Sequence, residues 1–307
     1  MTIDPHFLVV IAGPTSVGKT SMALEIAGSL SAEILSADSR QFYKEMRIGT
    51  ACPSMAQLSQ VPHHFIRHLS IHEPYNLGLY ERDAIAKLDQ LFLKSRFAVL
   101  VGGSGLYLRA VCHGLDVMPD PDESLRNELK LLYDHSGIGI LREKLKALDP
   151  VYYNKVDLNN PFRIIRALEV CISSGGPYSE LRKNKPAQRK FFVTGIGLDL
   201  PREDLYKRIN RRTDTMMEEG LLEEARALLP YRHLNALNTV GYKELFEHFD
   251  GKVSLSEALE MIRQHTRHYA KRQMTWFRKD PLLQWFRPDK GGDILKFIRQ
   301  KEMRVRR

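Results

Sequence analysis

Eight residues near the N-terminus, GPTSVGKT at positions 13–20, have the types and spacing needed to bind phosphate. They fit the pattern G-x-x-x-x-G-K-[ST], in which glycines let main-chain N–H groups close around an anion. Lys19 supplies a positive charge for a terminal phosphate, and the Thr20 hydroxyl is a ligand for Mg²⁺. The pattern predicts a ligand with adjoining phosphates and leaves open whether that ligand is a nucleotide. The residues of this predicted diphosphate- or nucleotide-binding loop are Gly13, Pro14, Thr15, Ser16, Val17, Gly18, Lys19 and Thr20.

The segments on either side of this loop fit its expected context. Residues 7–12 form a short apolar run with β-branched side chains, which is typical of a buried strand. Residues 21–30 follow as a predicted helix with Met22, Ile26 and Leu30 on one face. The N-terminus of such a helix adds a positive dipole end to the anion site. The alternative is a chance match in a tight strand-to-helix turn.

A carboxylate, Asp38, follows a second predicted strand over residues 34–37. The carboxyl edge of an open α/β sheet is where ligands bind, so Asp38 is a candidate metal ligand, base or helix N-cap. A third strand over residues 97–101 runs into Gly102, Gly103 and Ser104. Kinases and NTPases with this loop often place a Mg²⁺-binding Asp there, so its absence weakens that interpretation. The glycines permit close approach of a ligand, or they form a plain turn.

Residues 119–190 have the pattern of helices without intervening strands. We expect helices over 124–136, 139–148 and 162–172, the last ended by Gly175 and Gly176. Strand character returns over 191–198. The predicted fold is therefore an α/β P-loop core, residues 1–118 and 191–307, whose parallel sheet is flanked by helices, with an inserted all-helical lobe, residues 119–190. Arg163 and Arg166 share a helical face there, and Arg126 is another possible basic contact; each of the three could instead form a surface ion pair.

The C-terminal part of the chain carries the positive charge. The net charge is +9, and residues 261–307 contain fourteen Lys or Arg against four Asp or Glu. Such a basic region indicates a polyanion partner, most often nucleic acid, although residues 296–307 could be a solubilising tail. A helix over 202–229, interrupted near Gly220, places Arg208 and Arg212 one turn apart, where they could reach a diphosphate.

The last predicted helix starts at a capping box, Ser254 with Glu257, and runs to about residue 278. We expect Tyr269 and Trp276 to pack inward. Its end, KRQMTWFR at residues 271–278, mixes basic, amide and aromatic side chains that suit phosphate contacts and base stacking, or simply the core.

Composition places limits on other classes of protein. With 307 residues, 43% hydrophobic and 27% charged, the chain is globular. No apolar run reaches the roughly 18 residues of a membrane span, and no leader pattern opens the chain. The three cysteines have no paired spacing, which favours a reducing compartment. We therefore expect a cytoplasmic protein without membrane contact. The histidines at 63, 64, 68 and 72 match no metal-site spacing.

Six motifs in order resemble those of the bacterial tRNA dimethylallyltransferases, also called tRNA isopentenyltransferases. They are residues 13–20, DSRQFY at 38–43, GGSGLY at 102–107, NPFRIIRALE at 160–169, VGY at 240–242 and KRQMTWFR at 271–278. The resemblance spans about residues 7–287. It implies transfer of a dimethylallyl group from dimethylallyl diphosphate to N6 of the adenine 3′ to the anticodon, in tRNAs that read codons starting with U. It also implies a monomer that uses Mg²⁺ and binds the tRNA anticodon arm.

The resemblance also implies a role for each matching residue. Asp38 would be the base, and Lys19, Thr20 with Mg²⁺, and Arg212 would stabilise charge on the diphosphate. The implied tRNA contacts are Asp38, Ser39, Arg40, Gln41, Ser104, Arg126, Phe162, Arg163, Ile164, Ile165, Arg166, Asn238, Thr239, Val240, Gly241, Tyr242, Lys243, Lys271, Arg272, Gln273, Met274, Thr275, Trp276, Phe277 and Arg278. Three alternatives share the loop: an adenylate isopentenyltransferase acting on free nucleotide, a small-molecule kinase, and a nucleic-acid-binding NTPase.

Overall fold

The computed structural model describes residues 4–120, 122–183 and 185–306, and the chain divides into two compact units. The larger unit comprises residues 1–112 and 188–307, and the smaller one comprises residues 113–187. The boundaries predicted from the sequence are at 119 and 190. Residues 1–3, 121, 184 and 307 belong to the ranges predicted for the core and the lobe and lie outside the described residues.

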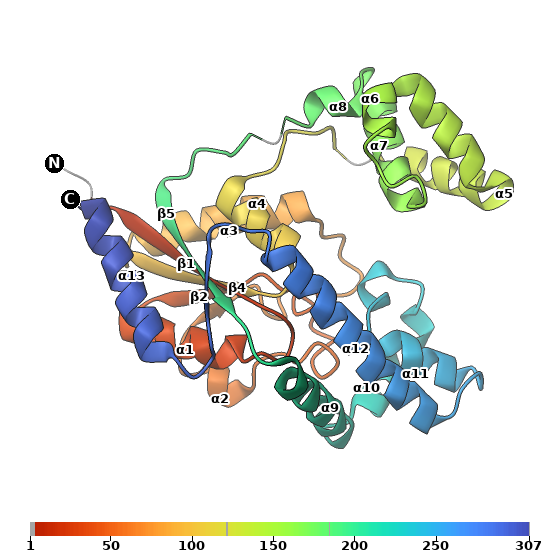
Figure 1. Ribbon diagram of the computed structural model, residues 1–307. Helices are drawn as coiled ribbons and strands as arrows, with labels where there is room; N and C mark the ends of the chain where they lie inside the picture. The colour runs from red at the N-terminus through yellow and green to blue at the C-terminus, as the bar shows by residue number, and fades with distance from the viewer. Residues whose placement is uncertain (1–3, 121, 184, 307) are drawn as a thin grey trace. The chain divides into compact units, whose positions relative to one another are not determined.

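A six-stranded sheet forms the centre of the larger unit (Figure 1). The strand order is β3-β2-β4-β1-β5-β6, and each neighbouring pair is parallel. The apolar run after the N-terminus becomes the central strand β1, which explains why its side chains are buried on both faces. The prediction of a parallel α/β sheet is confirmed. The strands are β1 (His6–Ala12), β2 (Glu33–Ser36), β3 (His63–His64), β4 (Phe97–Gly102), β5 (Phe191–Leu198) and β6 (Leu283–Phe286).

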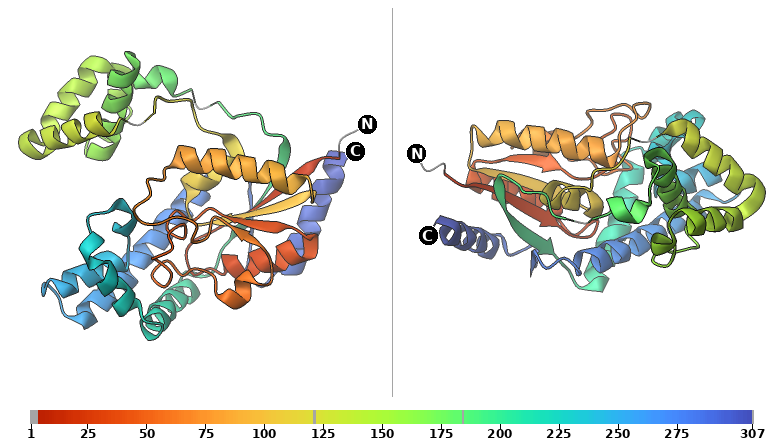
Figure 2. Two further views of the ribbon diagram at one scale, coloured as in Figure 1. Left: turned by 180° about the vertical axis from the view of Figure 1, so that it is seen from behind. Right: turned by 90° about the horizontal axis from the view of Figure 1, so that it is seen from above.

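Helices cover both faces of this sheet, as the view from above in Figure 2 shows. On one face α1 (Lys19–Leu30), α9 (Arg202–Glu218) and α13 (Gly291–Arg306) pack on β1 and its neighbours. On the other face α3 (Leu77–Phe92) and α4 (Gly105–His113) bury Tyr80, Leu88 and Leu108. The layers hold the carboxyl ends of the parallel strands in fixed positions at one edge.

A second group of helices in the larger unit follows α9. It consists of α10 (Leu221–Leu228), α11 (Tyr242–Phe249) and α12 (Leu255–Phe277), with short 3₁₀ turns at Leu229–Tyr231 and Asn235–Leu237. Their apolar faces share a core with the segment after β2, where the short α2 (Met55–Leu58) also lies. Gly220, in the left-handed region at φ 98°, separates α9 from α10 where the interruption was predicted. The predicted capping box of Ser254 and Glu257 is confirmed at the start of α12.

The smaller unit is entirely helical in its described residues. It contains α5 (Glu123–Leu148), α6 (Pro150–Tyr153), α7 (Pro161–Ser174) and α8 (Tyr178–Leu181), packed around Leu141, Leu145 and Leu168. Gly137, at φ 72° and ψ −176°, breaks α5 between the two helices predicted there. Gly175, in the left-handed region, ends α7 as predicted.

The larger unit differs from the predictions in three places. Residues 296–306 are not a solubilising tail, because they belong to α13, which buries Ile294 and Ile298 against α1. The strands β3 and β6 were not predicted, because each is short and lies at an edge of the sheet. Tyr269 and Trp276 pack inward only in part: they are 36% and 42% exposed, and the Trp276 indole lies against Gly105. Within the described chain, no helix is long and apolar enough to cross a membrane.

Candidate functional site

The phosphate loop connects β1 to α1 through backbone that glycine makes possible. Gly13 has φ 154°, and a Cβ there would lie 2.8 Å from the carbonyl oxygen of Leu198. Gly18 has φ 108° and caps the start of α1. The main-chain N–H groups in the first turn of a helix have no partners within that helix. The start of α1 therefore offers main-chain donors and the positive end of the helix dipole to an anion.

Lys19 holds a buried ammonium group over this loop. Its Nζ donates to the carbonyl oxygens of Gly13 at 3.0 Å and Pro14 at 2.7 Å. Burial lowers the pKa of Lys19 to about 8; the Asp38 charge opposes this shift, and the Arg212 charge adds to it. A buried cation of this kind gains most from a bound anion, which would raise its pKa again.

Helix α9 brings two arginines to the loop from the side. Arg212 donates to the hydroxyls of Thr15 at 3.1 Å and Ser16 at 3.4 Å, while Arg208 donates to the carbonyl oxygen of Val17 at 3.1 Å. Burial lowers the pKa of Arg212, and the negative charge of Asp38 opposes this effect. Both predicted arginines thus reach the loop, and Arg212 reaches the loop's side-chain hydroxyls.

Asp38 follows β2 at the same edge of the sheet. Its Oδ1 accepts a hydrogen bond from the Arg40 main-chain N–H at 3.1 Å, so it stabilises a turn. No helix begins there in the described chain, so the N-cap interpretation is wrong. The main-chain N–H of Ser39 donates to Ser104 Oγ at 3.3 Å, which links this turn to the end of β4. The negative charge of Asp38 favours the charged forms of both Lys19 and Arg212.

Arg40 and Gln41 are engaged within the protein. The Arg40 guanidinium donates to the carbonyl oxygens of Asn235 at 2.9 Å and Ala236 at 3.2 Å. The Gln41 amide donates to the carbonyl oxygens of Thr50 and Ala51, each at 3.2 Å. Their hydrogen bonds fix the segment that carries Asp38, a role that sequence spacing does not reveal.

The end of α12 presents one face to solvent and another to the core. Five of the predicted RNA contacts have exposed side chains there, whereas Met274 is half-buried; the exposed ones are Lys271, Arg272, Thr275, Trp276 and Arg278. Arg278 pairs with Asp199 at 2.9 Å. Gln273 and Phe277 are only 6% and 2% exposed. A helical period of 3.6 residues turns these two side chains inward, so the expectation that they contact RNA requires correction.

Residues 238–243 show a similar division. Asn238 and Lys243 are exposed, Thr239 and Val240 are half-buried, and Gly241 is buried. Tyr242 is fully buried, and its hydroxyl donates to Glu224 at 2.7 Å. Its ring also lies against Gly49, where a Cβ would come within 2.6 Å. The Tyr242 side chain therefore supports the fold and is not exposed to solvent.

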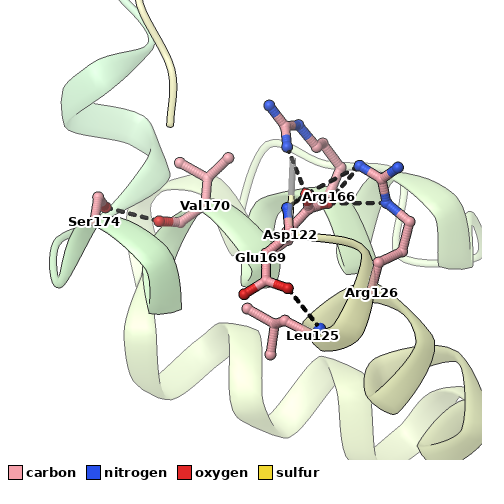
Figure 3. Close-up of polar contacts among 7 residues, drawn as sticks. All are labelled: Asp122, Leu125, Arg126, Arg166, Glu169, Val170 and Ser174. Carbon is pink, nitrogen blue, oxygen red and sulfur yellow. Dashed lines mark hydrogen bonds and ion pairs between the residues drawn. The ribbon is translucent and has the colours of Figure 1, made fainter. Parts of the chain in front are cut away.

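In the smaller unit, Glu169 is the partner of two predicted RNA-binding arginines (Figure 3). Its carboxylate, 1% exposed, accepts from Arg126 Nη2 at 2.8 Å, from Arg166 Nη1 at 2.9 Å and from the Asp122 N–H at 3.2 Å. The structure therefore shows Arg126 and Arg166 in ion pairs, as the second of the two interpretations predicted. The spacing of Arg166 and Glu169, three residues apart on a helix, is the signal that could have indicated it.

Other predicted contacts on α7 differ in exposure. Ile164 and Ile165 are 0% and 8% exposed in the core of the smaller unit, so their side chains cannot reach RNA and that expectation is corrected. Phe162 is 78% exposed and Arg163 is also exposed. The Asn160 side chain caps the helix by accepting from the Arg163 N–H at 3.1 Å. The first turn of α7 therefore offers an aromatic ring and a cation to solvent.

We expect Glu169→Ala to destabilise the smaller unit. Removing a buried partner leaves its cations uncompensated, which costs about 3–5 kcal/mol when both groups are buried. Arg126 and Arg166 retain 44% and 34% exposure of their side chains, so solvent screening reduces the expected loss to about 2 kcal/mol. Urea unfolding measures it. Glu128→Ala, at an exposed site on α5, is the control, and equal stability of the two variants would contradict the expectation.

The site contains few protein ligands for a metal ion. Among the described residues, no three His, Cys, Asp or Glu side chains come together. His63 and His64 are engaged with the Val61 carbonyl oxygen and with Glu33. The Thr20 hydroxyl lies at the start of α1. Mg²⁺ is commonly held by one or two protein oxygens together with substrate phosphates and water, and Thr20 beside the phosphate loop fits that pattern.

The fold and the site define a class: a P-loop α/β protein whose phosphate site is flanked by a carboxylate and by basic helices. The sequence profile of the family described as IPP transferase matches residues 41–280. The chain belongs to the IPP transferase family.

Similar proteins agree with this assignment. The chain is 50% identical to a tRNA dimethylallyltransferase of Christiangramia forsetii, over 96% of this chain and 98% of that protein. It is 46% identical to tRNA dimethylallyltransferase 1 of Bacteroides thetaiotaomicron, over 96% of each chain. Among solved structures, the full-length tRNA isopentenylpyrophosphate transferase of Bacillus halodurans matches with a TM-score of 0.72 and 36% identity, covering 97% of both chains. A eukaryotic dimethylallyltransferase acting on tRNA matches with a TM-score of 0.76 and 26% identity, over 88% of this chain and 69% of that one.

Proposed function

We propose that this protein transfers the dimethylallyl group of dimethylallyl diphosphate to N6 of the adenine 3′ to the anticodon, in tRNAs that read codons starting with U. The observation that carries this proposal is the placement of three residues at the carboxyl edge of the sheet: Lys19 and Arg212 bind the phosphate loop that follows β1, and Asp38 lies in the turn after β2. Two cations at a phosphate loop suit a diphosphate leaving group, and a carboxylate beside them suits a proton acceptor.

The reaction forms one bond and breaks one. The N6 nitrogen attacks the allylic carbon that carries the diphosphate, the carbon–oxygen bond breaks, and diphosphate leaves with the bonding electrons. An adenine amine is a weak nucleophile, and Asp38 accepts the N6 proton as the new bond forms. A positioned base contributes typically 10²–10⁴-fold to such a step. The turn that Arg40 and Ser104 support holds the carboxylate in place.

Negative charge develops on the diphosphate as it leaves. Lys19, Arg212 and the N–H groups of the phosphate loop are fixed before the reaction, so they stabilise this charge without reorganising. Bound Mg²⁺, held by the Thr20 hydroxyl and by the substrate, would neutralise further charge. A nucleotide is not required in this scheme. The lack of an acidic residue at the end of β4, where Gly102 and Gly103 stand, agrees with that.

The RNA contacts are assigned to exposed side chains only. On α12 these are Lys271, Arg272, Thr275, Trp276 and Arg278, and in the smaller unit Phe162 and Arg163. Arg126 and Arg166 keep part of their guanidinium groups in solvent beside Glu169. All the proposed groups come from one chain, so we propose that it acts as a monomer. A tRNA substrate and three free thiols suit a cytoplasmic enzyme.

The deciding experiment is a transfer assay without ATP. Purified protein, Mg²⁺ and labelled dimethylallyl diphosphate are mixed with unmodified tRNA or with free AMP. Label on tRNA is the expected result. Label on AMP alone would instead indicate the adenylate isopentenyltransferase alternative. RNA-stimulated ATP hydrolysis without transfer would indicate a nucleic-acid-dependent NTPase, and phosphate transfer from ATP to a small molecule would indicate a kinase.

We expect Lys271→Ala to reduce the salt dependence of tRNA binding. Each phosphate contact that is lost lowers the slope of log K against log salt by roughly one. Lys271 is exposed and free to make such a contact, whereas Asp199 already neutralises part of the Arg278 charge. Arg278→Ala should therefore change the slope less.

Filter binding from low to moderate salt measures both slopes. Lys296→Ala, at an exposed position of α13, is the control and should keep the slope of the unmodified protein. Unchanged slopes for Lys271→Ala and Arg278→Ala would place the RNA on another surface.

A further inference from the structure

One buried amide connects α12 to the phosphate loop. Gln273 Oε1 accepts the main-chain N–H of Thr15 at 2.9 Å, and Gln273 Nε2 donates to the carbonyl oxygen of Gly103 at 2.8 Å. The side chain is 6% exposed. Both partners are main-chain groups of loops that follow adjacent strands, β1 and β4. A single side chain thus joins, through two hydrogen bonds, the two loops that border the proposed diphosphate site.

Gly103 allows this amide to approach the main chain closely. A Cβ at Gly103 would lie 2.3 Å from Gln273 Nε2 and 3.6 Å from Lys19 Nζ. Gly103 therefore lies beside the cation of the phosphate loop as well as the glutamine. A shift of Gln273 moves either the Thr15 N–H or the Gly103 carbonyl, and both movements change the surroundings of Lys19.

The same helix carries exposed side chains that the proposed function assigns to RNA. Lys271 and Thr275 lie on the face opposite Gln273, whereas Arg272 and Trp276 lie to its sides, and all four are exposed. The helix is rigid over this stretch because its main-chain hydrogen bonds are continuous. Displacement of its outer face by a bound polyanion is therefore transmitted to Gln273.

Helix α9 strengthens this connection. Arg267 of α12 donates to Asn210 of α9 at 3.1 Å. Helix α9 in turn holds the phosphate loop through Arg208 and Arg212. The phosphate loop is therefore held from two helices that are themselves joined, and Gln273 provides the direct link from α12.

We propose that Gln273 is a positioning residue that couples RNA binding on α12 to diphosphate binding at the phosphate loop. The proposal rests on the proposed function, because that function assigns the RNA to α12. Gln273 does not contact the reacting atoms in this proposal; it acts through the Thr15 and Gly103 main chain. The chemical reason for glutamine is that the site needs one acceptor and one donor. A glutamate supplies no donor to Gly103, and a methionine supplies neither.

The test measures binding of inorganic diphosphate with Mg²⁺, in the presence and absence of unmodified tRNA. Coupling between two sites is reciprocal and is commonly 5- to 150-fold. We expect tRNA to tighten diphosphate binding to the unmodified protein within that range, and Gln273→Met to bring the ratio close to one. The variant should also bind diphosphate alone about 5- to 150-fold more weakly, the range expected for one main-chain group of the site left without its partner. Its tRNA affinity without diphosphate should stay within about twofold, as expected for a buried side chain that lies off the proposed RNA surface.

The control is Gln264→Met, the same substitution at an exposed position of the same helix, which should keep the coupling ratio. A ratio of one in the unmodified protein, or an unchanged ratio in Gln273→Met, would overturn the proposal. Equal weakening of tRNA and diphosphate binding by Gln273→Met would also overturn it, because it would indicate damage to the helix. These binding measurements do not need turnover. If the unmodified protein couples the two ligands but transfers no label to tRNA, the proposed reaction fails and the coupling stands.

Discussion

Asp38→Asn should lose turnover by about 10²–10⁴-fold while its affinity for tRNA changes less than about twofold. Asparagine has nearly the same shape and still offers an oxygen to the Arg40 N–H, so the turn after β2 is kept. What it loses is the capacity to accept the N6 proton. The expected factor corresponds to about 2.7–5.5 kcal/mol of transition-state stabilisation.

Single-turnover transfer of labelled dimethylallyl to tRNA measures the chemical step, and filter binding measures the affinity. Asp89→Asn, at an exposed site of α3, is the control and should behave like the unmodified protein. Parallel loss of affinity and turnover in Asp38→Asn would show that Asp38 binds RNA and does not act as a base.

Much of the core was predictable because local signals and the global fold agree there. The apolar run over residues 7–12, the phosphate loop and the amphipathic segment after it each favour one structure, and they became β1 and α1. The breaks at Gly137, Gly175 and Gly220 were also predictable, since each glycine adopts positive φ at the end or interruption of a helical pattern. Strands β3 and β6 were not predictable in the same way: β3 has only two residues, too few to show a period, and both are edge strands with no fully buried residue.

The sequence does not reveal which residues of each motif face the core and which face solvent. Residues 271–278 form one basic and aromatic run, yet Gln273 and Phe277 face inward, whereas Lys271 and Arg272 are exposed. Which side of a helix meets the core depends on elements that arrive from distant parts of the chain, here Thr15 and Gly103. The buried Glu169 is a comparable case, since its ring of partners forms only when α5 and α7 pack together.

Lys19→Met should reduce kcat/KM for dimethylallyl diphosphate by about 10²–10³-fold, the loss typical of removing one fixed donor to a developing negative charge. Methionine preserves the apolar length of the side chain, so the phosphate loop can keep its backbone. Steady-state kinetics with saturating tRNA measures the effect. If Lys19→Met kept the kcat/KM of the unmodified protein for dimethylallyl diphosphate, the loop would bind another ligand.

The pH dependence of the reaction provides a second test of Lys19. Because burial lowers its pKa to about 8 in the free protein, kcat/KM for the donor should fall by about tenfold per pH unit above pH 8. In the complex the diphosphate charge raises this pKa, so kcat should stay level over the same range. Lys19→Met should remove the inflection.

Asp38 is one of the charges that act on Lys19, and its attraction holds the pKa of Lys19 up. In Asp38→Asn the inflection of kcat/KM should therefore move below pH 8, in addition to the loss of turnover. If Asp38 acted only as a general base and did not influence Lys19, Asp38→Asn would leave the inflection of kcat/KM for the donor at the same pH. The shift connects the two residues through one measurement, and its absence would mean that the carboxylate and the ammonium do not share a site in solution.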